Sequence, residues 1–212
     1  MDIVKIVEEK MGQNTYIIND DKTAVIIDAG ASVEAIEEHI NLFEHKPEVK
    51  AVLITHAHFD HIRNLDAILK KFDCKAYICE SGKEMLYSKD KNLSYLDEEP
   101  FVIKAKRDIE TFRDGDTLTF GALDFICYNT PGHSVDSSCF AIMDNLFTGD
   151  TVFKVGVGRT DMYSGNEDVL RISLNRLKDE IATDINNFYA GHGANFDKSD
   201  FEYNVDRVLG EI

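Results

Sequence analysis

The sequence lacks any long apolar run. Apolar stretches such as residues 24–27 and 51–54 are far shorter than the roughly 20 residues that a membrane-spanning helix requires. The amino-terminal residues mix charged with apolar side chains, so they do not form the uninterrupted apolar core of a secretory leader. We therefore expect no membrane association and a cytoplasmic location.

Cysteine is scarce, and the few cysteines are isolated. Cys74, Cys79, Cys127 and Cys139 form no C-x-x-C pair, which is the spacing typical of thiolate metal sites and redox centres. Isolated cysteines of cytoplasmic proteins are most often buried packing residues. We expect these cysteines to be reduced and mostly buried, with no part in a functional site.

Basic residues are outnumbered by acidic ones. The chain has 23 Lys and Arg against 39 Asp and Glu, which gives a formal net charge of −16. The negative field of such a protein repels phosphate backbones and argues against a nucleic-acid partner. A bound metal can still make one site locally positive. We therefore expect a small-molecule substrate, and the composition leaves the oligomeric state undefined.

Low-complexity segments, proline-rich linkers and internal repeats are also absent. The three prolines are spread along the chain, at positions 47, 100 and 131. With 43% hydrophobic residues, a chain of 212 residues can fill one sizeable core. We expect a single domain over residues 1–212.

The chain does contain short β-rich segments that alternate with amphipathic helical ones. Expected strands are residues 3–7, 15–18, 23–27, 49–55, 75–79, 117–120, 123–129, 138–143, 146–148 and 187–190. Expected helices are residues 33–43 after the N-cap Ser32, residues 64–72, a turn after Ser81, and residues 168–179 and 199–209. Two packed sheets covered by helices would bury these elements, an α/β architecture. The polar segment 87–107 is either a loop over the functional site or a solvated surface segment.

Four candidate metal ligands, His56, His58, Asp60 and His61, follow directly after the predicted buried strand 49–55. The carboxyl ends of such strands are where open α/β sheets place their binding loops. If the strand continues through this segment, residues 56, 58 and 60 point to one side, and a tight turn brings residue 61 to a second position. The spacing thus predicts two neighbouring metal sites. Imidazole and carboxylate ligands suit Zn²⁺, Mn²⁺ or Fe²⁺, and the lack of thiolates favours a catalytic over a structural centre.

Further ligands are expected from three later positions. His133, Asp150 and His192 each follow a predicted strand and stand beside a glycine, which lets the backbone turn sharply in a crowded coordination sphere. The remaining histidines, His39 and His45, lack that setting and are expected to be solvated.

With these motifs in place, the chain resembles the metallo-β-lactamase-fold hydrolases. The H-x-H-x-D-H motif of that family is matched by His56, His58, Asp60 and His61, and its later His, Asp and His positions by His133, Asp150 and His192. Asp28 resembles an early structural Asp of the family. The resemblance implies an αββα sandwich of two mixed β-sheets flanked by helices.

The same resemblance implies two divalent metal ions, with zinc expected and iron or manganese as alternatives. It places one ion on His56, His58 and His133, the other on Asp60, His61 and His192, and Asp150 between them. A hydroxide shared by the two metals would be the nucleophile, with Asp60 or Asp150 orienting its proton.

The segment Gly158-Arg159-Thr160-Asp161 resembles the glyoxalase II branch of the family, whose members are thioesterases acting on hydroxyacylglutathione or related thioesters. A thioesterase of this type is therefore the expected function. Glutathione is left open as the thiol, because the extra carboxyl-terminal helical domain of full-length glyoxalase II is not expected here. Arg159 either contacts a substrate carboxylate or forms a buried ion pair with an acid such as Asp161.

Two alternatives share this resemblance. Persulfide dioxygenases contain the same Gly-Arg-Thr-Asp segment and use one iron at the positions of His56, His133 and Asp150. A lactonase or another metallo-hydrolase of the same fold is the further alternative. Metal stoichiometry and substrate preference distinguish these functions.

Overall fold

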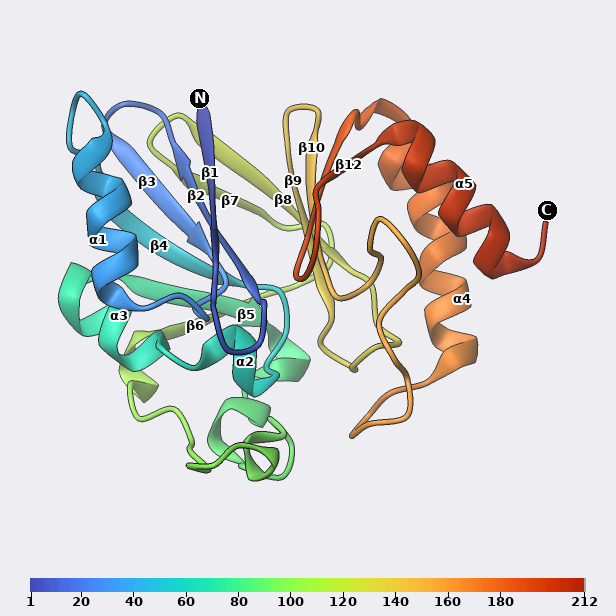
Figure 1. Cartoon of the computed structure of the whole chain (residues 1–212), viewed down its shortest axis with the longest axis horizontal. Coiled ribbons are helices and arrows are strands. Elements are labelled where there is room, and N and C mark those ends of the chain that lie inside the picture. Colours follow the sequence, from blue (N-terminus) through green and yellow to red (C-terminus); the bar gives the residue numbers. More distant parts are fainter. Residues whose placement is uncertain (212) are drawn as a thin grey trace.

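The computed structural model describes residues 1–211, and in this part of the chain two six-stranded sheets face each other between outer helices (Figure 1). The first sheet, in spatial order, contains β1 (Asp2–Val7), β2 (Asn14–Asn19), β3 (Thr23–Ile27), β4 (Glu48–Ile54), β5 (Lys75–Cys79) and β6 (Ile109–Phe112). The second contains β12 (Phe196–Asp197), β11 (Asn187–Ala190), β10 (Asn145–Gly149), β9 (Ser138–Ile142), β8 (Leu123–Asn129) and β7 (Thr117–Phe120). This arrangement confirms the αββα sandwich.

Both sheets are mixed. In the first sheet β1, β2 and β3 pair antiparallel, whereas β3, β4, β5 and β6 pair parallel, with Ile26 opposite Val52. In the second sheet only the β10–β11 pair is parallel among the described strands. Strands β3, β9 and β10 are buried along their whole length because each is covered on both faces, and β3 and β9 are mostly apolar for that reason.

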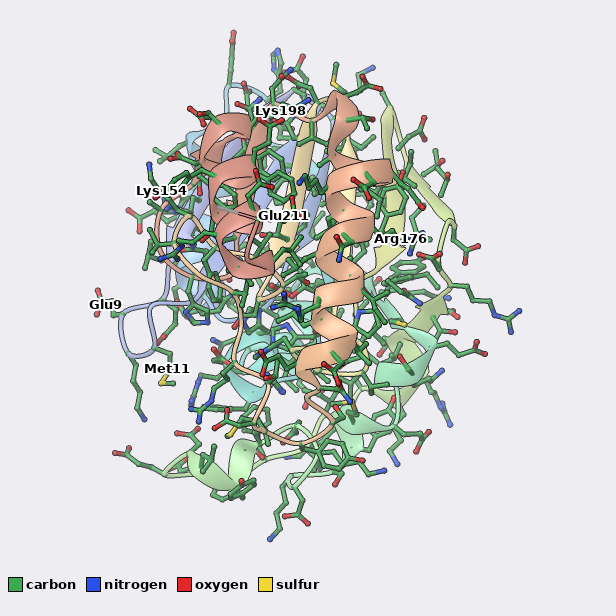
Figure 2. All side chains as sticks on the ribbon, turned by 90° about the vertical axis from the view of Figure 1, so that its right-hand side faces the viewer. Glu9, Met11, Lys154, Arg176, Lys198 and Glu211 are labelled. Atoms are coloured by element: carbon green, nitrogen blue, oxygen red, sulfur yellow. The ribbon has the colours of Figure 1, made fainter. Side chains whose placement is uncertain are left out.

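Helices cover the outer face of each sheet. The α-helices are α1 (Val33–Leu42), α2 (Phe59–Ile62), α3 (Leu65–Phe72), α4 (Glu167–Arg176) and α5 (Lys198–Leu209). Ile36 of α1 and Ile68 of α3 pack in one apolar cluster with the outer face of the first sheet. Figure 2 shows α4 and α5 side by side over the second sheet, where Leu174 of α4 and Phe201 of α5 share a cluster with Phe188 of β11. A third cluster fills the space between the sheets.

Short elements complete the chain. They are the 3₁₀ turns η1 (Glu80–Gly82), η2 (Met85–Tyr87), η3 (Ser94–Leu96), η4 (Lys106–Asp108) and η6 (Ala182–Asp184), and the π-helical turn η5 (Leu177–Ile181). Strands β6 and β12 and helix α2 were not predicted, because each is too short to show a period in the sequence. The helix predicted for residues 168–179 ends at Arg176 and continues as η5.

The expectations about cysteines and membrane spans can be compared directly with the structure. All four cysteines are free and buried, as predicted. Within residues 1–211, no helix has the length and apolar character needed to span a bilayer.

Tyr16 of β2 joins the two sheets. Its ring packs edge-on against Phe147 of β10 at 5.3 Å and Tyr189 of β11 at 5.5 Å between centroids, and its hydroxyl donates to the carbonyl oxygen of Ala190 at 2.7 Å. Close by, the backbone amide of Asn14 donates to the carbonyl oxygen of Gly191 at 2.7 Å. The start of β2 is therefore attached to the end of β11, directly before His192.

We expect Tyr16→Phe to lower the free energy of unfolding by about 1–2 kcal/mol through loss of the hydroxyl hydrogen bond, and Tyr16→Ala by about 3–5 kcal/mol through the added cavity. Urea unfolding followed by circular dichroism measures both. Tyr203→Phe, at a side chain that is 64% exposed, serves as the control and should change stability by less than about 0.5 kcal/mol. Equal effects of Tyr16→Phe and Tyr203→Phe would contradict the proposed attachment.

Candidate metal centre

All the predicted ligands lie on the segments that follow strands at one end of the two sheets. His56 and His58 follow β4, His133 follows β8, Asp150 follows β10 and His192 follows β11. Asp60 and His61 lie in α2, which begins at Phe59. The two sheets face each other, so loops that leave them at the same end meet above the space between them.

Strand β4 ends at Ile54, close to the predicted end at residue 55, and the extended continuation through residue 60 that was considered for the sequence is not formed. His58 has extended backbone angles, and the chain then turns into the helical α2. The turn directs Asp60 and His61 together toward His192 rather than placing Asp60 beside His56 and His58. The prediction of two neighbouring ligand groups agrees with this geometry.

Three imidazoles form the first group. Nε2 of His133 lies 3.2 Å from Nε2 of His56 and 2.9 Å from Nδ1 of His58. The other ring nitrogen of His133, Nδ1, donates to the backbone carbonyl oxygen of Arg159 at 2.7 Å, so its Nε2 carries a lone pair. Burial lowers the pKa of His58 to about 3 and the pKa of His56 well below its ordinary value, so both rings are neutral. Neutral, converging imidazole nitrogens are the donor set that a divalent transition metal requires.

Asp60, His61 and His192 form the second group. Nε2 of His192 lies 3.1 Å and Nε2 of His61 3.7 Å from Oδ2 of Asp60. Burial opposes ionisation of Asp60, but the charges of His61 and His192 hold its pKa well below the ordinary value, so the group is a carboxylate. This group offers one anionic and two imidazole ligands.

Asp150 lies between the two groups. Its Oδ1 is 3.4 Å from Nε2 of His61, and its Oδ2 is 3.8 Å from Nε2 of His133 and 3.7 Å from Nε2 of His192. Nε2 of His61 and Oδ1 of Asp150 are buried without a hydrogen-bond partner. Such groups are costly unless a cation satisfies them. The residues present therefore fit two divalent ions with Asp150 shared.

Two glycines make the crowding possible. Gly132, before His133, has φ +140°, and a Cβ there would overlap the backbone of Leu170 in α4. Gly149, before Asp150, has φ +50°, and a Cβ would lie 2.7 Å from Cβ of Thr55. At both positions only glycine combines the backbone angles with the close approach.

Asp28 orients His61. It follows β3 with φ +61°, an uncommon conformation outside glycine, and its Oδ2 accepts a hydrogen bond from Nδ1 of His61 at 2.7 Å. Oδ1 accepts from the amide of Thr55 at 2.8 Å. The contact fixes the orientation of the His61 ring, with Nδ1 on Asp28 and Nε2 directed toward Asp60 and Asp150. The structural position expected for Asp28 agrees with this geometry.

Asp136 supports the first group and was missed in the sequence. The carboxyl group is fully buried; its Oδ2 accepts from the amide of Ala57 at 2.8 Å and its Oδ1 from the hydroxyl of Ser134 at 2.7 Å. Ala57 stands between His56 and His58, and Ser134 follows His133, so one side chain ties together the loops that carry all three imidazoles. Burial raises the pKa of Asp136 to about 6. A lone Asp in a polar loop has no sequence signal for this contact.

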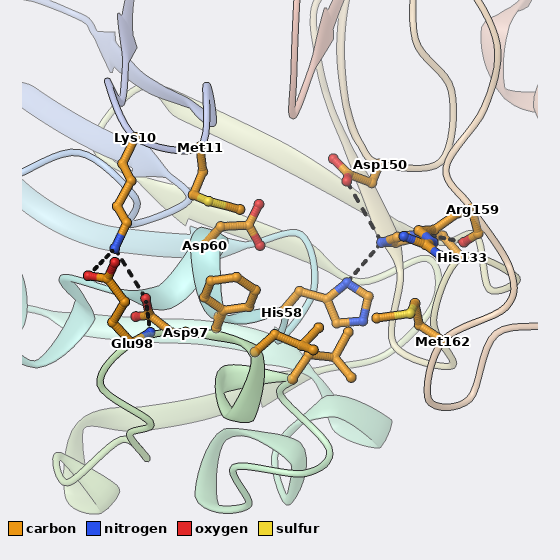
Figure 3. A pocket seen from close by; sticks show the side chains of 13 residues that line it. Lys10, Met11, His58, Asp60, Asp97, Glu98, His133, Asp150, Arg159 and Met162 are labelled. Carbon is orange, nitrogen blue, oxygen red and sulfur yellow. Dashed lines mark hydrogen bonds and ion pairs between the residues drawn. The ribbon is translucent and has the colours of Figure 1, made fainter.

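A cavity of about 430 Å³ opens above the ligands (Figure 3). Its base includes His58, Asp60, His133 and Asp150. The surrounding walls are formed by Lys10, Met11, Phe59, Leu93, Leu96, Asp97, Glu98, Arg159 and Met162. Four of these residues belong to the segment 87–107, so part of that segment lies over the site, as one of the two interpretations expected. The turn that contains Lys10 and Met11 was not identified from the sequence, because it has no periodic or motif signal.

Arg159 lines the cavity but is not buried. Its guanidinium binds the carboxylate of Asp161 in a bidentate pair, at 2.6 and 2.7 Å, and the two side chains are 64% and 68% exposed. The predicted ion pair between Arg159 and Asp161 is thus present, but the prediction that it is buried was wrong. His39 and His45 lie outside the centre; His45 is exposed, and Nδ1 of the half-buried His39 contacts the carbonyl oxygen of Ala35.

Comparison with known proteins agrees with this geometry. The family model described as Metallo-beta-lactamase superfamily matches residues 9–192. A probable metallo-hydrolase of Streptococcus pyogenes serotype M6 is 33% identical over 200 residues, which cover 91% of this chain and 84% of that protein. The probable polyketide biosynthesis zinc-dependent hydrolase PksB of Bacillus subtilis is 29% identical over 179 residues, covering 84% of this chain and 71% of PksB.

The same likeness is found among solved structures. The crystal structure of BLEG-1 B3 metallo-beta-lactamase matches with a TM-score of 0.87 and 28% identity, covering 99% of this chain and 100% of that chain. The likeness extends over both sheets and their helices.

We expect Asp28→Asn to weaken zinc binding at the Asp60, His61 and His192 group by about 10- to 100-fold, because the amide no longer fixes the ring of His61 through a charge. Zinc titration against a chromophoric chelator measures the affinity, and circular dichroism checks the fold. Asp124→Asn, at an exposed residue of β8, is the matched control. Unchanged zinc affinity in Asp28→Asn would show that His61 needs no such partner.

Asp136 should make the metal-free protein less stable as pH rises. Its pKa is about 6 in the folded protein against an ordinary 3.8, so the folded state holds the proton more tightly than the unfolded chain. The stabilisation is complete below pH 3.8 and is lost as pH rises through 6. Relative to Asp136→Asn, the wild type should lose roughly 3 kcal/mol of unfolding free energy between about pH 4 and pH 8. Urea unfolding in EDTA measures the difference, and parallel pH profiles would refute the assignment.

Proposed function

The chain belongs to the metallo-beta-lactamase superfamily and is a metal-dependent hydrolase, and from this premise we propose that it hydrolyses thioesters at a two-metal centre. In the proposed reaction water adds to the thioester carbonyl carbon, the C–S bond breaks, and the products are a carboxylic acid and a free thiol. The chain's part is to hold the metals, orient the water and bind the acyl and thiol groups.

The observation that supports two metals is the convergence of seven His and Asp side chains as three overlapping ligand groups. His56, His58 and His133 would hold one ion, and Asp60, His61 and His192 the other. Asp150 contacts members of both sets, which suits a bridging carboxylate. We propose zinc as the metal, in keeping with the zinc-dependent relative PksB.

When bound, the ions would lower the pKa of a shared water and polarise the carbonyl oxygen. Asp60 and Asp150 both face the cavity, so either carboxylate can accept a hydrogen bond from the attacking water and fix its orientation. Arg159 holds His133 through its backbone carbonyl, and Asp28 holds His61, so the ligand geometry is set before substrate enters. A nucleophilic protein side chain is not required.

The choice of thioesters rests on the Gly158-Arg159-Thr160-Asp161 segment, of which Arg159 lines the cavity and accepts a hydrogen bond from His133 through its backbone carbonyl. A cavity of about 430 Å³ suits a small molecule rather than a macromolecule. Because the similar BLEG-1 protein is described as a metallo-beta-lactamase, β-lactams are the natural comparison substrates. Lactones complete the panel.

The test is a substrate panel of thioesters, β-lactams and lactones, assayed with zinc, manganese and iron forms of the protein. We expect thioesters to give the highest kcat/KM, chelation to abolish turnover, and zinc to restore it. His133→Ala and Asp60→Ala should lower kcat by more than about 100-fold, since even residues that only support ligands cost up to that much. His45→Ala, at an exposed histidine, is the control. Retained activity in His133→Ala would contradict the ligand assignment.

Metal analysis separates the hydrolase from the persulfide dioxygenase. Protein loaded to saturation should bind two metals per chain, and oxygen uptake on glutathione persulfide should stay at background. One iron per chain together with rapid oxygen uptake would replace the thioesterase proposal.

A further inference from the structure

We propose that the cavity selects thioesters whose acyl group is apolar and whose thiol carries no charge, rather than thioesters of anionic thiols such as glutathione or coenzyme A. This inference rests on the proposed thioesterase function and names its substrate class. Two independent observations carry it: the apolar walls of the cavity and the pairing of both cations that line it.

The walls above the metal ligands are largely apolar. They are contributed by Met11, Phe59, Leu93, Leu96 and Met162, which come from four separate segments of the chain. Figure 3 shows the Met11 side chain directed toward Asp60 and the Met162 side chain toward His58. Unbranched, flexible methionines adapt to acyl chains of different shape.

Part of this apolar surface faces water in the absence of substrate. Met11 is 42% exposed and Leu96 is 53% exposed, although both line the cavity. Covering them with an apolar acyl chain removes apolar surface from water on both partners. Each CH₂ group that becomes fully buried is expected to raise kcat/KM by about fourfold until the cavity is filled.

The cationic side chains of the cavity are already paired. Nζ of Lys10 lies 3.4 Å from Oδ1 of Asp97 and 3.2 Å from Oε2 of Glu98, and Asp97 also binds Arg63 at 2.6 Å. Arg159 lies on the opposite side of the view in Figure 3. Its Nε and Nη2 both donate to the carboxylate of Asp161. An anionic substrate group would have to share one of these cations with a carboxylate that already binds it.

The acids that neutralise the cations also repel anions. Asp97 and Glu98 both line the cavity, and Asp97 is only 4% exposed, so water screens its charge poorly. Away from the metal ions, a carboxylate or phosphate of the thiol would lose hydration on approach and would meet only side-chain cations that are already paired. An uncharged thiol avoids this cost, which favours it over glutathione.

The decisive experiment compares one acyl group on three thiols. N-acetylcysteamine is uncharged, glutathione carries carboxylates and coenzyme A carries phosphates. With the zinc-loaded full chain, we expect kcat/KM to be at least about tenfold higher for the N-acetylcysteamine thioester, and to rise with acyl length from acetyl to octanoyl. A preference for glutathione or coenzyme A overturns this inference alone. Absence of turnover on every thioester overturns the proposed function and this inference with it.

Glu98→Gln tests the cation pairing. Removing one partner of Lys10 should raise the ratio of kcat/KM for the glutathione thioester to that for the N-acetylcysteamine thioester by about threefold. Glu110→Gln is the matched control, because Glu110 forms a similar exposed pair with Lys75 outside the cavity. A ratio that stays the same in both variants contradicts the charge argument.

Leu96→Ser tests the apolar wall. We expect kcat/KM for the octanoyl thioester to fall about three- to tenfold, with a much smaller change for the acetyl thioester. Leu42→Ser, at a leucine of α1 that is 76% exposed, should leave both values unchanged. An equal loss on short and long acyl groups would show that Leu96 does not contact the acyl chain.

Discussion

Nε2 of His133 lies within 3.2 Å of ring nitrogens of both His56 and His58, and Oδ1 of the nearby Asp150 is buried without a hydrogen-bond partner. Burying such groups is unfavourable for the polypeptide alone, and the cost disappears when a cation takes the space between them. The fold tolerates the arrangement because five of the seven candidate ligands directly follow packed strands and the other two lie in α2, close after β4. Strand β4 belongs to the first sheet and strands β8, β10 and β11 belong to the second, so the centre exists only while the two sheets are packed together.

Buried carboxylates transmit that rigidity to the ligands. Asp28 connects β3 to His61, and Asp136 connects the loop after β8 to the loop after β4. Each carboxylate bonds two segments that are far apart in the sequence. The positions of the packed strands therefore fix the positions of the ligands. The hydrogen-bond partners of the two carboxylates differ. Asp28 faces the imidazole of His61, whereas Asp136 accepts hydrogen bonds from a neutral amide and a hydroxyl. Their chemistry therefore suits orientation rather than proton transfer to substrate.

Most of the fold, and the candidate ligands that the structure brings together, could be predicted from the sequence because their signals are local. Apolar runs bounded by turns predict strands, the period of α1 and α5 predicts helices, and His and Asp beside glycine after a strand predict ligands. The short helix α2 after Ile54 was not predicted, because a single helical turn has no period to detect. Asp136, Lys10 and Met11 were missed, because their importance comes from contacts between segments that only the folded chain brings together.

The walls of the cavity come largely from parts of the chain other than those that form its floor. The ligands are fixed at strand ends, whereas the turn with Lys10 and Met11 and the stretch with Leu93, Leu96 and Glu98 lie on surface segments joined by exposed ion pairs. Substitutions in these segments can alter which molecules enter without disturbing a ligand. The sandwich thereby separates the evolution of selectivity from the preservation of chemistry, and new specificities are accessible through few mutations at little cost to the metal centre.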